Sequence, residues 1–497
     1  MLKKYFLLFF ISFTSINVLA FERCRSIGEN VNWTNCDHSN GRYFKHLRGA
    51  NLKGAILHDA KLDGVDLSNA DLSSARIYRT YLDRTGSLVG ANLSHLDLSS
   101  KHGDRPHNFN SKNLSGAKFI ETDLTGVDFT GANLTNVDFS GAILTNVKFN
   151  SARLDGANLS RAKVSGTAIA SAATLAGANL SHLDLSNITL SHRNLIGTDF
   201  SEANLTNTNL GAGNLSNAKF IKADLTNVVF VHSNLSNANL SKANVAGTNF
   251  DHAGLHHANL SGANNMEKAF RLELAHLFYT NLAETNLKGK HFNGKSLIGV
   301  GFVKADLESA NFDRANLTTA DLSYAKNLDT VKNLELATLH HTNLAHTNLK
   351  GKHFNGKSLI GVGFVGAELE GANFDRADLN KADLSYAKNM DKVVNLEWAT
   401  LNFTNLAHTN LSRKNFGSKR LVRVGFVGTN LSYADLTYTN LSNADLKGAN
   451  LRHAKLSHAE HLDNNPTIGT TDFSRADWVD GRTWCLEGSF GYCKPGN

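Results

Sequence analysis

The feature that most constrains the fold of this chain is an apolar residue at every fifth position. In the stretch NLKGAILHDAKLDGVDLSNADLSSA the apolar centres are Leu52, Leu57, Leu62, Leu67 and Leu72. The period continues with short slips from Leu47 to Leu456 and comprises about 80 centres. An α-helix repeats its apolar face about every 3.6 residues and a strand about every 2.0, so neither element explains the pattern.

Each centre lies in a constant local pattern. A small residue, usually Ala, stands two positions before the centre, Asn or Asp stands directly before it, and Ser or Thr and then Gly, Asn or another polar residue follow. We interpret each pentapeptide as one short extended side and one turn, with the centre and the small residue pointing inward. Four sides close a square coil of about 20 residues, and stacked coils pair through the backbone at ~4.8 Å, with like side chains in ladders.

The repeated A(N/D)LXX motif, as in GANLTNVDFSGAILTNVKF, resembles the pentapeptide-repeat family. The resemblance covers about 410 of the 497 residues. It implies an all-β fold, a right-handed quadrilateral β-helix. Four pentapeptides per coil then predict about 20 coils and a length of roughly 95 Å. The open ends of such a solenoid need caps, because an unpaired edge would pair with other chains.

The N-terminal segment 1–20 has the layout of a secretory signal peptide. Lys3 and Lys4 precede an apolar run from Tyr5 to Phe13, and small residues close the segment at Ala20. The alternative, an uncleaved membrane anchor, requires roughly 20 apolar residues, and this run is interrupted earlier. We therefore expect export, with cleavage near Ala20 and no transmembrane segment in the mature chain.

The four cysteines occupy the two ends of the chain. Cys24 and Cys36 lie near one terminus and Cys485 and Cys493 near the other, and four cysteines allow three pairings. A solenoid of this length separates its ends by far more than the ~7 Å limit between bridged Cα atoms. We therefore predict the pairs Cys24–Cys36 and Cys485–Cys493. A zinc site is the alternative, but two distant pairs cannot supply four ligands to one ion.

These observations divide the chain into five segments. We predict a signal peptide (1–20), an N-terminal cap with Cys24 and Cys36 (21–46), a repeat region (47–260), a second repeat region with a longer period (261–456), and a C-terminal cap with Cys485 and Cys493 (457–497). We expect the cap aromatics to cover the exposed apolar ends of the solenoid, although they could also form a carbohydrate or peptide site. The residues concerned are Trp33, Trp478, Trp484, Phe490 and Tyr492.

The period slips by one residue at three places before position 200. The slips run from Leu82 to Leu88, from Leu98 to Phe109 and from Ile169 to Leu175. A single surplus residue predicts a bulge or a looped corner. The second slip contains SSKHGDRPHN, with His102, Pro106 and His107, and is the most loop-like stretch of the repeat region.

A longer repeat occupies the second region. GKHFNGKSLIGVGF begins at Gly289 and again at Gly351, and RKNFGSKRLVRVGF follows at Arg413. Two further one-residue slips surround each of Met266, Leu328 and Met390, so a 62-residue unit holds 12 centres and should span three coils. Equivalent residues should then lie on one face, ~14 Å apart.

This longer repeat carries the candidate binding stripe. Its lysines occupy the small-residue position, where an inward charge would be costly, so we expect the side chains to bend or bulge outward. Regular positive clusters would suit an anionic polymer, whereas the alternative is that wider coils accommodate the lysines without a function. The stripe consists of Lys290, Lys295, Lys352, Lys357, Lys414 and Lys419, with His291, His353, Arg413, Arg420 and Arg423 nearby.

The sequence contains none of the common catalytic motifs. HExxH, GxSxG, the P-loop and a GxGxxG after a strand are all absent, and we predict neither enzymatic activity nor a cofactor. The 22 histidines raise a metal hypothesis, for example at His232 and His252, which should stack because they lie four pentapeptides apart. A histidine ladder on a solvent-facing side is more often only polar surface. Glu202 and Lys222 should form a similar cross-coil pair.

We therefore predict an exported, monomeric, non-enzymatic solenoid that binds an unidentified protein or an anionic polymer, with no small-molecule substrate evident. An effector that acts on a host-cell partner would have the same sequence features. The family resemblance also implies a third possibility, since some members imitate DNA and act on type II topoisomerases. That role requires an acidic surface, and this chain has a net charge of +7, which loss of Lys3 and Lys4 lowers by two. We do not expect it to bind nucleic acid.

Overall fold

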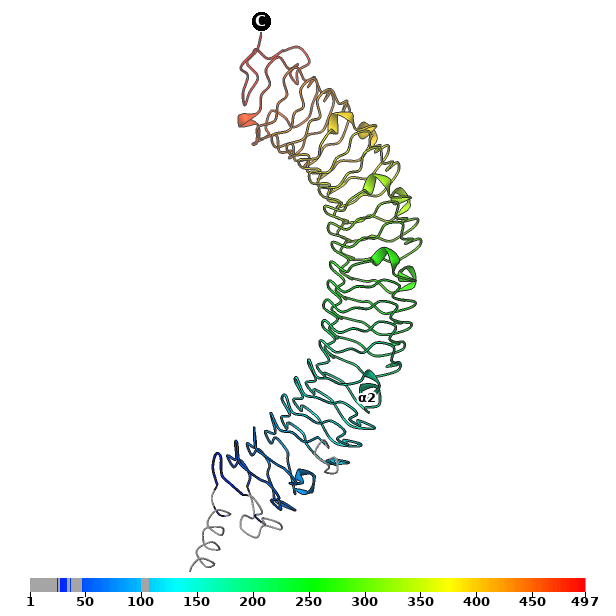
Figure 1. Cartoon of the computed structure of the whole chain (residues 1–497). Helices are drawn as coiled ribbons and strands as arrows, with labels where there is room; N and C mark the ends of the chain where they lie inside the picture. Colours follow the sequence, from blue (N-terminus) through cyan, green and yellow to red (C-terminus); the bar gives the residue numbers. More distant parts are fainter. Residues whose placement is uncertain (1–24, 26, 34–35, 37–46, 100–106, 497) are drawn as a thin grey trace, which may run out of the picture. The chain divides into compact units, whose positions relative to one another are not determined.

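The computed structural model describes residues 25, 27–33, 36, 47–99 and 107–496. It divides into two compact units, one ending at Gly254 and the other running from Leu255 to Asn497. Within each unit the chain winds into stacked coils (Figure 1). The signal peptide and Cys24 lie outside the described residues, and so do residues 100–106 with His102 and Pro106.

The described coils are joined by parallel bridges of one residue each. A typical bridge joins residues 20 apart, as in Asn204 with Asp224 and Asp224 with Asn244. These extended segments are too short to be assigned as β-strands. The elements assigned in the described residues are short helical turns. The pairing is the one expected for coils of four pentapeptides.

One pentapeptide shows why its residue types are selected. The Asn204 N–H donates to Leu183 O in the preceding coil, and the N–H groups of Leu205 and Asn207 donate to the following coil. The Thr206 N–H donates to the side-chain Oδ1 of Asn204 at 3.1 Å, and the Thr208 N–H closes the turn on Leu205 O. All five backbone N–H groups of this pentapeptide thus have an acceptor. The side chain of the Asn or Asp before each centre is the acceptor for one of them.

The turn residue two positions after each centre has a left-handed backbone. Asn207 has φ +59°, and Gly247, its equivalent two coils later, has φ +68°. Glycine and asparagine reach this region at the lowest cost. This explains why the sequence pattern prefers them there.

The centres form the core, as the period predicts. Phe129 is fully buried, and its ring stacks on Phe109 and Phe149 at 5.5 and 5.7 Å while meeting Phe119 and Phe139 edge to face. The second unit repeats the arrangement, for example where Phe292 and Phe312 stack at 5.3 Å.

The described slips are helical turns. The 3-10 turn η2 (Leu82–Arg84) lies at the first slip and the short helix α2 (Gly166–Ala170, labelled in Figure 1) at the third. Each 62-residue unit contains two 3-10 turns, and a last one lies near the C-terminus. They are η3 (Met266–Lys268), η4 (Leu272–Leu274), η5 (Leu328–Thr330), η6 (Leu334–Leu336), η7 (Met390–Lys392), η8 (Leu396–Trp398) and η9 (Ile468–Thr470).

The register of the longer repeat is confirmed. Asn281 bridges Gly301, Gly301 bridges Asp321, and Asp321 bridges Asn343, so residues 62 apart are three coils apart on one ladder. The surplus residues are absorbed one at a time: the offset between bridged residues is 21 after η5, at Asn311 with Lys332, and 22 after η6, at Asn316 with Thr338.

The C-terminal cap ends the parallel ladder by reversing the chain. Antiparallel bridges join Asp472 to Phe490 and Asp477 to Trp484, and the predicted bond between Cys485 and Cys493 is present, with Cα atoms 5.0 Å apart. Of the aromatic residues expected to cover this end, Trp478 lies edge to face with the buried Phe473 at 5.1 Å, whereas Trp484, Phe490 and Tyr492 are 47–60% exposed. Cys485 and Phe473 fill the interior instead.

At the N-terminal end the described residues agree in part with the predicted cap. Trp33 is fully buried and its N–H donates to Ile56 O, while Asn32 bridges Ile56. Cys36 is also buried. Because Cys24 lies outside the described residues, the bond between Cys24 and Cys36 stays a prediction.

The stacked core predicts a large effect at Phe129. Phe129→Ala should lower the free energy of unfolding by about 3–5 kcal/mol, and Phe129→Asp by more, because a carboxylate would lie among rings without a partner. Thermal melts followed by circular dichroism measure the change. Phe270→Ala is the control, because Phe270 is 62% exposed; equal losses for both positions would contradict the assignment of the centres to the core.

The caps predict the covalent structure of the exported protein. Non-reducing peptide mapping of the mature chain should show Cys485 joined to Cys493, Cys24 joined to Cys36, and a first residue near Phe21. A bond between the two ends, or a chain that retains residues 1–20, would contradict the cap assignment or the predicted export.

Candidate functional site

The six lysines of the predicted stripe bind the protein's own backbone. Each ammonium group donates a hydrogen bond to a carbonyl about one coil earlier in the chain, at 2.5–3.0 Å. The donor and acceptor pairs are Lys290 with Ala269, Lys295 with Ala275, Lys352 with Val331, Lys357 with Ala337, Lys414 with Val393, and Lys419 with Ala399. The expectation that these side chains bend outward is therefore wrong.

The 3-10 turns explain how a coil accommodates a lysine at the small-residue position. Each acceptor is the residue that directly follows one of the turns η3 to η8. In the middle unit, η5 begins after Asn327 (φ +60°) and ends at Val331, which is extended. The extra residue widens the corner, and the Lys352 ammonium caps the carbonyl at its end, as cations do at helix C-termini.

Partial burial and acidic neighbours set the electrostatics of these lysines. Burial lowers the pKa of all six ammonium groups. Carboxylates on the 3-10 turns oppose this effect, for example Glu335 and Asp329, which raise the pKa of Lys352. Each lysine charge is thus partly balanced within its own coil pair.

Neighbouring lysines on the surface form ion pairs. Lys288 lies 2.8 Å from Glu308, Lys350 lies 2.8 Å from Glu370, and Lys392 lies 3.0 Å from Glu370. Hydrogen bonds from the two lysines lower the pKa of the Glu370 carboxyl, and the bond to Glu308 raises the pKa of Lys288. The longer repeat is therefore less basic at its surface than its lysine content suggests.

A different surface of the second unit is more exposed. Six aromatic side chains occupy left-handed turn positions and are 46–62% exposed. We call them the aromatic turn residues: Tyr279, Tyr324, Tyr386, Phe403, Tyr433 and Tyr438. The sequence interpretation missed them, although an aromatic residue where the pattern prefers Gly or Asn is a detectable signal.

Histidines in adjacent coils stack on the tyrosines among them. Ring centroids lie 4.5 Å apart for Tyr324 with His346 and 4.6 Å for Tyr386 with His408, both nearly parallel. His257 with Tyr279, Tyr433 with His453 and Tyr438 with His458 stack in the same way, at 4.6–5.0 Å. Arg423 lies 5.6 Å over the Phe403 ring.

Glycine makes room for two of these histidines. A Cβ atom at Gly366 would lie 2.6 Å from Nδ1 of His346, and one at Gly428 would lie 2.7 Å from Nδ1 of His408. The imidazole therefore lies over bare backbone. Tyr, His and Gly therefore occupy the same corner in three successive coils, and together they fix the orientation of the stacked rings.

Two corners with aromatic turn residues border one face. Tyr279 and Phe403 lie on one corner, and Tyr324 and Tyr386 on the next. Between them runs a ladder of small polar residues, which we call the Asn–Gly–Asp face. Its members are Asn281, Gly301, Asp321, Asn343, Gly363, Asp383, Asn405, Gly425 and Asp445.

Two predicted cross-coil pairs in the first unit are confirmed as contacts. His232 and His252 have centroids 5.2 Å apart, and Lys222 lies 3.2 Å from Glu202. In the described part of the chain, no three His, Cys, Asp or Glu side chains are grouped so that they could hold a metal ion. No helix there is long and apolar enough to cross a membrane.

The chain matches the family model described as "Pentapeptide repeats (8 copies)". The matches lie within residues 46–85, 113–264, 275–328, 358–388 and 426–460, which is more than half of the chain. A right-handed quadrilateral β-helix is the fold that this match implies. A search of curated proteins found no match.

Three solved pentapeptide-repeat structures illustrate the similarity. A protein from the Arabidopsis thaliana thylakoid lumen is 16% identical, with 28% of this chain and 69% of that one covered and a TM-score of 0.13. QnrB1, a plasmid-mediated fluoroquinolone resistance protein, is 16% identical over 51% and 94%, with a TM-score of 0.15. HetL, involved in heterocyst differentiation regulation in the cyanobacterium Nostoc, is 18% identical over 77% and 94%, with a TM-score of 0.07.

The hydrogen bonds of the six lysines predict that replacing one of these residues lowers the stability of the protein more than replacing an exposed lysine. Lys352→Met keeps the aliphatic stem but removes the bond to Val331 O, and should lower the free energy of unfolding by about 1–3 kcal/mol. Lys350→Met is the matched control, because Lys350 is 60% exposed and solvent screens its ion pair with Glu370, so this change should have a much smaller effect. Chemical denaturation measures both, and equal effects would show that the carbonyl cap is unimportant.

Proposed function

Because the chain belongs to the pentapeptide-repeat family, we propose that it is an exported, non-enzymatic solenoid that binds a protein partner through the Asn–Gly–Asp face of its second unit. The observation that carries the proposal is the pair of aromatic corners that border this face. Proteins of this family are generally structural or interaction proteins, and the aromatic turn residues provide an interaction surface.

The chemistry of the face favours a protein over a polyanion. Tyr, Trp and Arg side chains contribute most of the binding energy in protein interfaces, and here Tyr324, Tyr386 and Phe403 are held in place by stacking. The face also carries Asp321 and Asp383 on its ladder, and these carboxylates would repel an anionic polymer. The small residues between the two corners leave a surface that the backbone of a partner can approach closely.

An anionic polymer remains the second candidate because five basic residues of the predicted stripe are exposed. These are His291, His353, Arg413, Arg420 and Arg423. Arg413 and Arg423 lie over aromatic rings at 5.8 and 5.6 Å, which leaves hydrogen-bond donors at the guanidinium edge for an oxyanion. Binding of this kind would weaken steeply with salt.

Export rests on the sequence of residues 1–20 and is supported by the bond between Cys485 and Cys493, since structural disulfides are typical of oxidising compartments. A partner in the envelope, the medium or a host cell would use the same face. About 20 coils and two disulfide-bonded caps complete the proposed molecule.

Three variants of the full mature chain test the proposal by capture of partners from envelope and medium, followed by affinity measurement. Tyr324→Ala, Tyr386→Ala and Phe403→Ala combined should weaken binding at least tenfold. The matched control combines Lys304→Ala, Thr319→Ala and Lys381→Ala, which lie on the same two corners with the same left-handed backbone, and should bind like the wild type.

The third variant changes the exposed residues His291, His353, Arg413 and Arg420 to Gln and keeps the six lysines that cap carbonyl groups. Loss of salt-sensitive binding to an envelope polymer in this variant alone would favour the anionic polymer and overturn the choice of a protein. Unchanged binding by the aromatic variant would show that the face is not the interface.

A further inference from the structure

The ladder between coils is interrupted between segments 75–81 and 95–99 of the first unit. Before it, the N–H groups of Leu72 and Ser74 donate to Asn92 O and Ser94 O in the following coil, at 2.8 and 2.9 Å. The equivalent groups one pentapeptide later belong to Ile77 and Arg79, and among the described residues neither has a hydrogen-bond partner. Two main-chain donors therefore lack a hydrogen-bond acceptor in the described part of the chain.

The interruption lies beside the longest slip, between Leu98 and Phe109. The residue that η2 inserts after Tyr81 does not cause it, because Asp66 still bridges Ser87 and Asp71 still bridges Asn92, at an offset of 21. No backbone hydrogen bond joins the residues of segments 75–81 and 95–99. Pairing resumes with Asp97 and Asp123, at an offset of 26.

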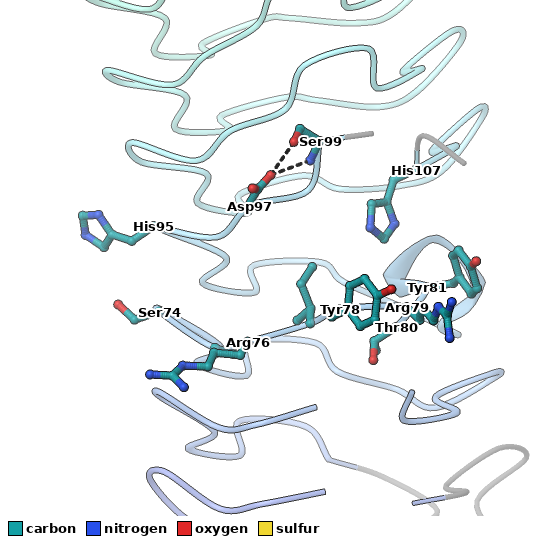
Figure 2. A pocket seen from close by; sticks show the side chains of 12 residues that line it. Ser74, Arg76, Tyr78, Arg79, Thr80, Tyr81, His95, Asp97, Ser99 and His107 are labelled. Carbon is teal, nitrogen blue, oxygen red and sulfur yellow. Dashed lines mark hydrogen bonds between the residues drawn. The ribbon is translucent and has the colours of Figure 1, made fainter. Parts of the chain in front are cut away.

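A cavity of about 390 Å³ fills the space between these segments (Figure 2). Its polar lining residues include Arg76, Arg79 and His107. Figure 2 shows Arg76 and His95 on one side of the cavity and Arg79, Tyr81 and His107 on the other. Its volume lies in the usual range of small-molecule sites.

His107 is the buried polar group of the cavity. It is only 7% exposed, its Nδ1 lies 3.4 Å from the Asp83 carboxylate, and its ring stacks on Phe109 at 5.9 Å. Among the described residues, no protein group hydrogen-bonds to Nε2. With Nδ1 facing the carboxylate, Nε2 is the atom available to a ligand.

The charge of the cavity is positive. Neither Arg76 nor Arg79 makes an ion pair within the described residues, and the Arg79 guanidinium lies 5.1 Å over the ring of Tyr78. Asp97 is the one carboxylate among the described lining residues, and its interactions include hydrogen bonds from the N–H and hydroxyl of Ser99 at 3.0 and 2.5 Å. The two guanidinium groups therefore outnumber the described carboxylate, which favours an oxyanion.

We propose that this cavity binds an acidic sugar unit of monosaccharide size. Its carboxylate is held by the free N–H groups of Ile77 and Arg79 and by the Arg79 guanidinium, a fork that matches a carboxylate. His107 Nε2, Asp97 and the hydroxyls of Ser74 and Ser99 serve the sugar hydroxyls. Tyr78, which is 43% exposed, offers an aromatic face to the apolar side of the ring.

The site is independent of the proposed protein interface, because every residue belongs to the first unit and the Asn–Gly–Asp face to the second. Failure of one proposal leaves the other intact. Sequence patterns could not indicate the cavity, since the unpaired donors are main-chain groups.

Isothermal titration of the full mature chain with D-glucuronate tests the proposal, with D-glucose and acetate as probes of the sugar and the carboxylate alone. Glucuronate should bind at least tenfold more tightly than either, and binding should weaken as salt is raised. Arg79→Gln should weaken glucuronate binding at least tenfold. Arg161→Gln, in a left-handed turn of the same unit (φ +59°) outside the cavity, should leave it within twofold.

Arg76→Gln provides a second variant, should Arg79→Gln fail to fold, and is expected to weaken binding in the same direction. Absence of glucuronate binding, equal binding by the Arg79→Gln chain, or equal binding of glucose would overturn the proposal. Acetate bound as tightly as glucuronate would overturn its sugar component.

Discussion

The hydrogen bonds between successive coils are the interaction on which the rest of the structure depends. Each pentapeptide directs one N–H group to the coil before it and two to the coil after it, as at Asn204, Leu205 and Asn207. These bonds fix the offset between coils at four pentapeptides wherever the period is regular. A surplus residue must therefore leave the ladder, and the places where this happens carry the irregular chemistry of the molecule.

The chain absorbs surplus residues in two physically different ways. At η5 and η6 the ladder continues, because an extended residue follows each turn and the offset simply grows to 21 and then 22. The widened corner exposes a carbonyl, and a lysine caps it. Beside the longer slip between Leu98 and Phe109 the ladder does not continue, and the donors of Ile77 and Arg79 face a cavity. A one-residue insertion is thus absorbed, whereas the longer slip opens a cavity.

The five-residue period predicted the structural features that depend only on how successive coils pair. The burial of Phe129, the position of the slips, the three-coil register of the 62-residue unit and the bond between Cys485 and Cys493 all follow from spacing. The conformation of Lys352 did not, because its ammonium binds a carbonyl that only the widened corner exposes. Nor does spacing predict how the C-terminal end is filled: Cys485 and Phe473 occupy the interior there, while Trp484 and Tyr492 are 47% and 60% exposed.

The turn residues explain why a fold so uniform inside can carry a specific surface. A left-handed backbone costs a residue other than glycine ~1–2 kcal/mol, and tyrosine and histidine incur this cost at Tyr386 and His408. Their stacking recovers part of it, and Gly428 below them removes the steric conflict. Because each coil contacts only its neighbours, such a stack can be introduced on one corner while the inward centres and the ladder stay unchanged. The aromatic turn residues therefore need no structural role in the core, and the occurrence of four of them, Tyr279, Tyr324, Tyr386 and Phe403, beside one face is better explained by binding than by stability.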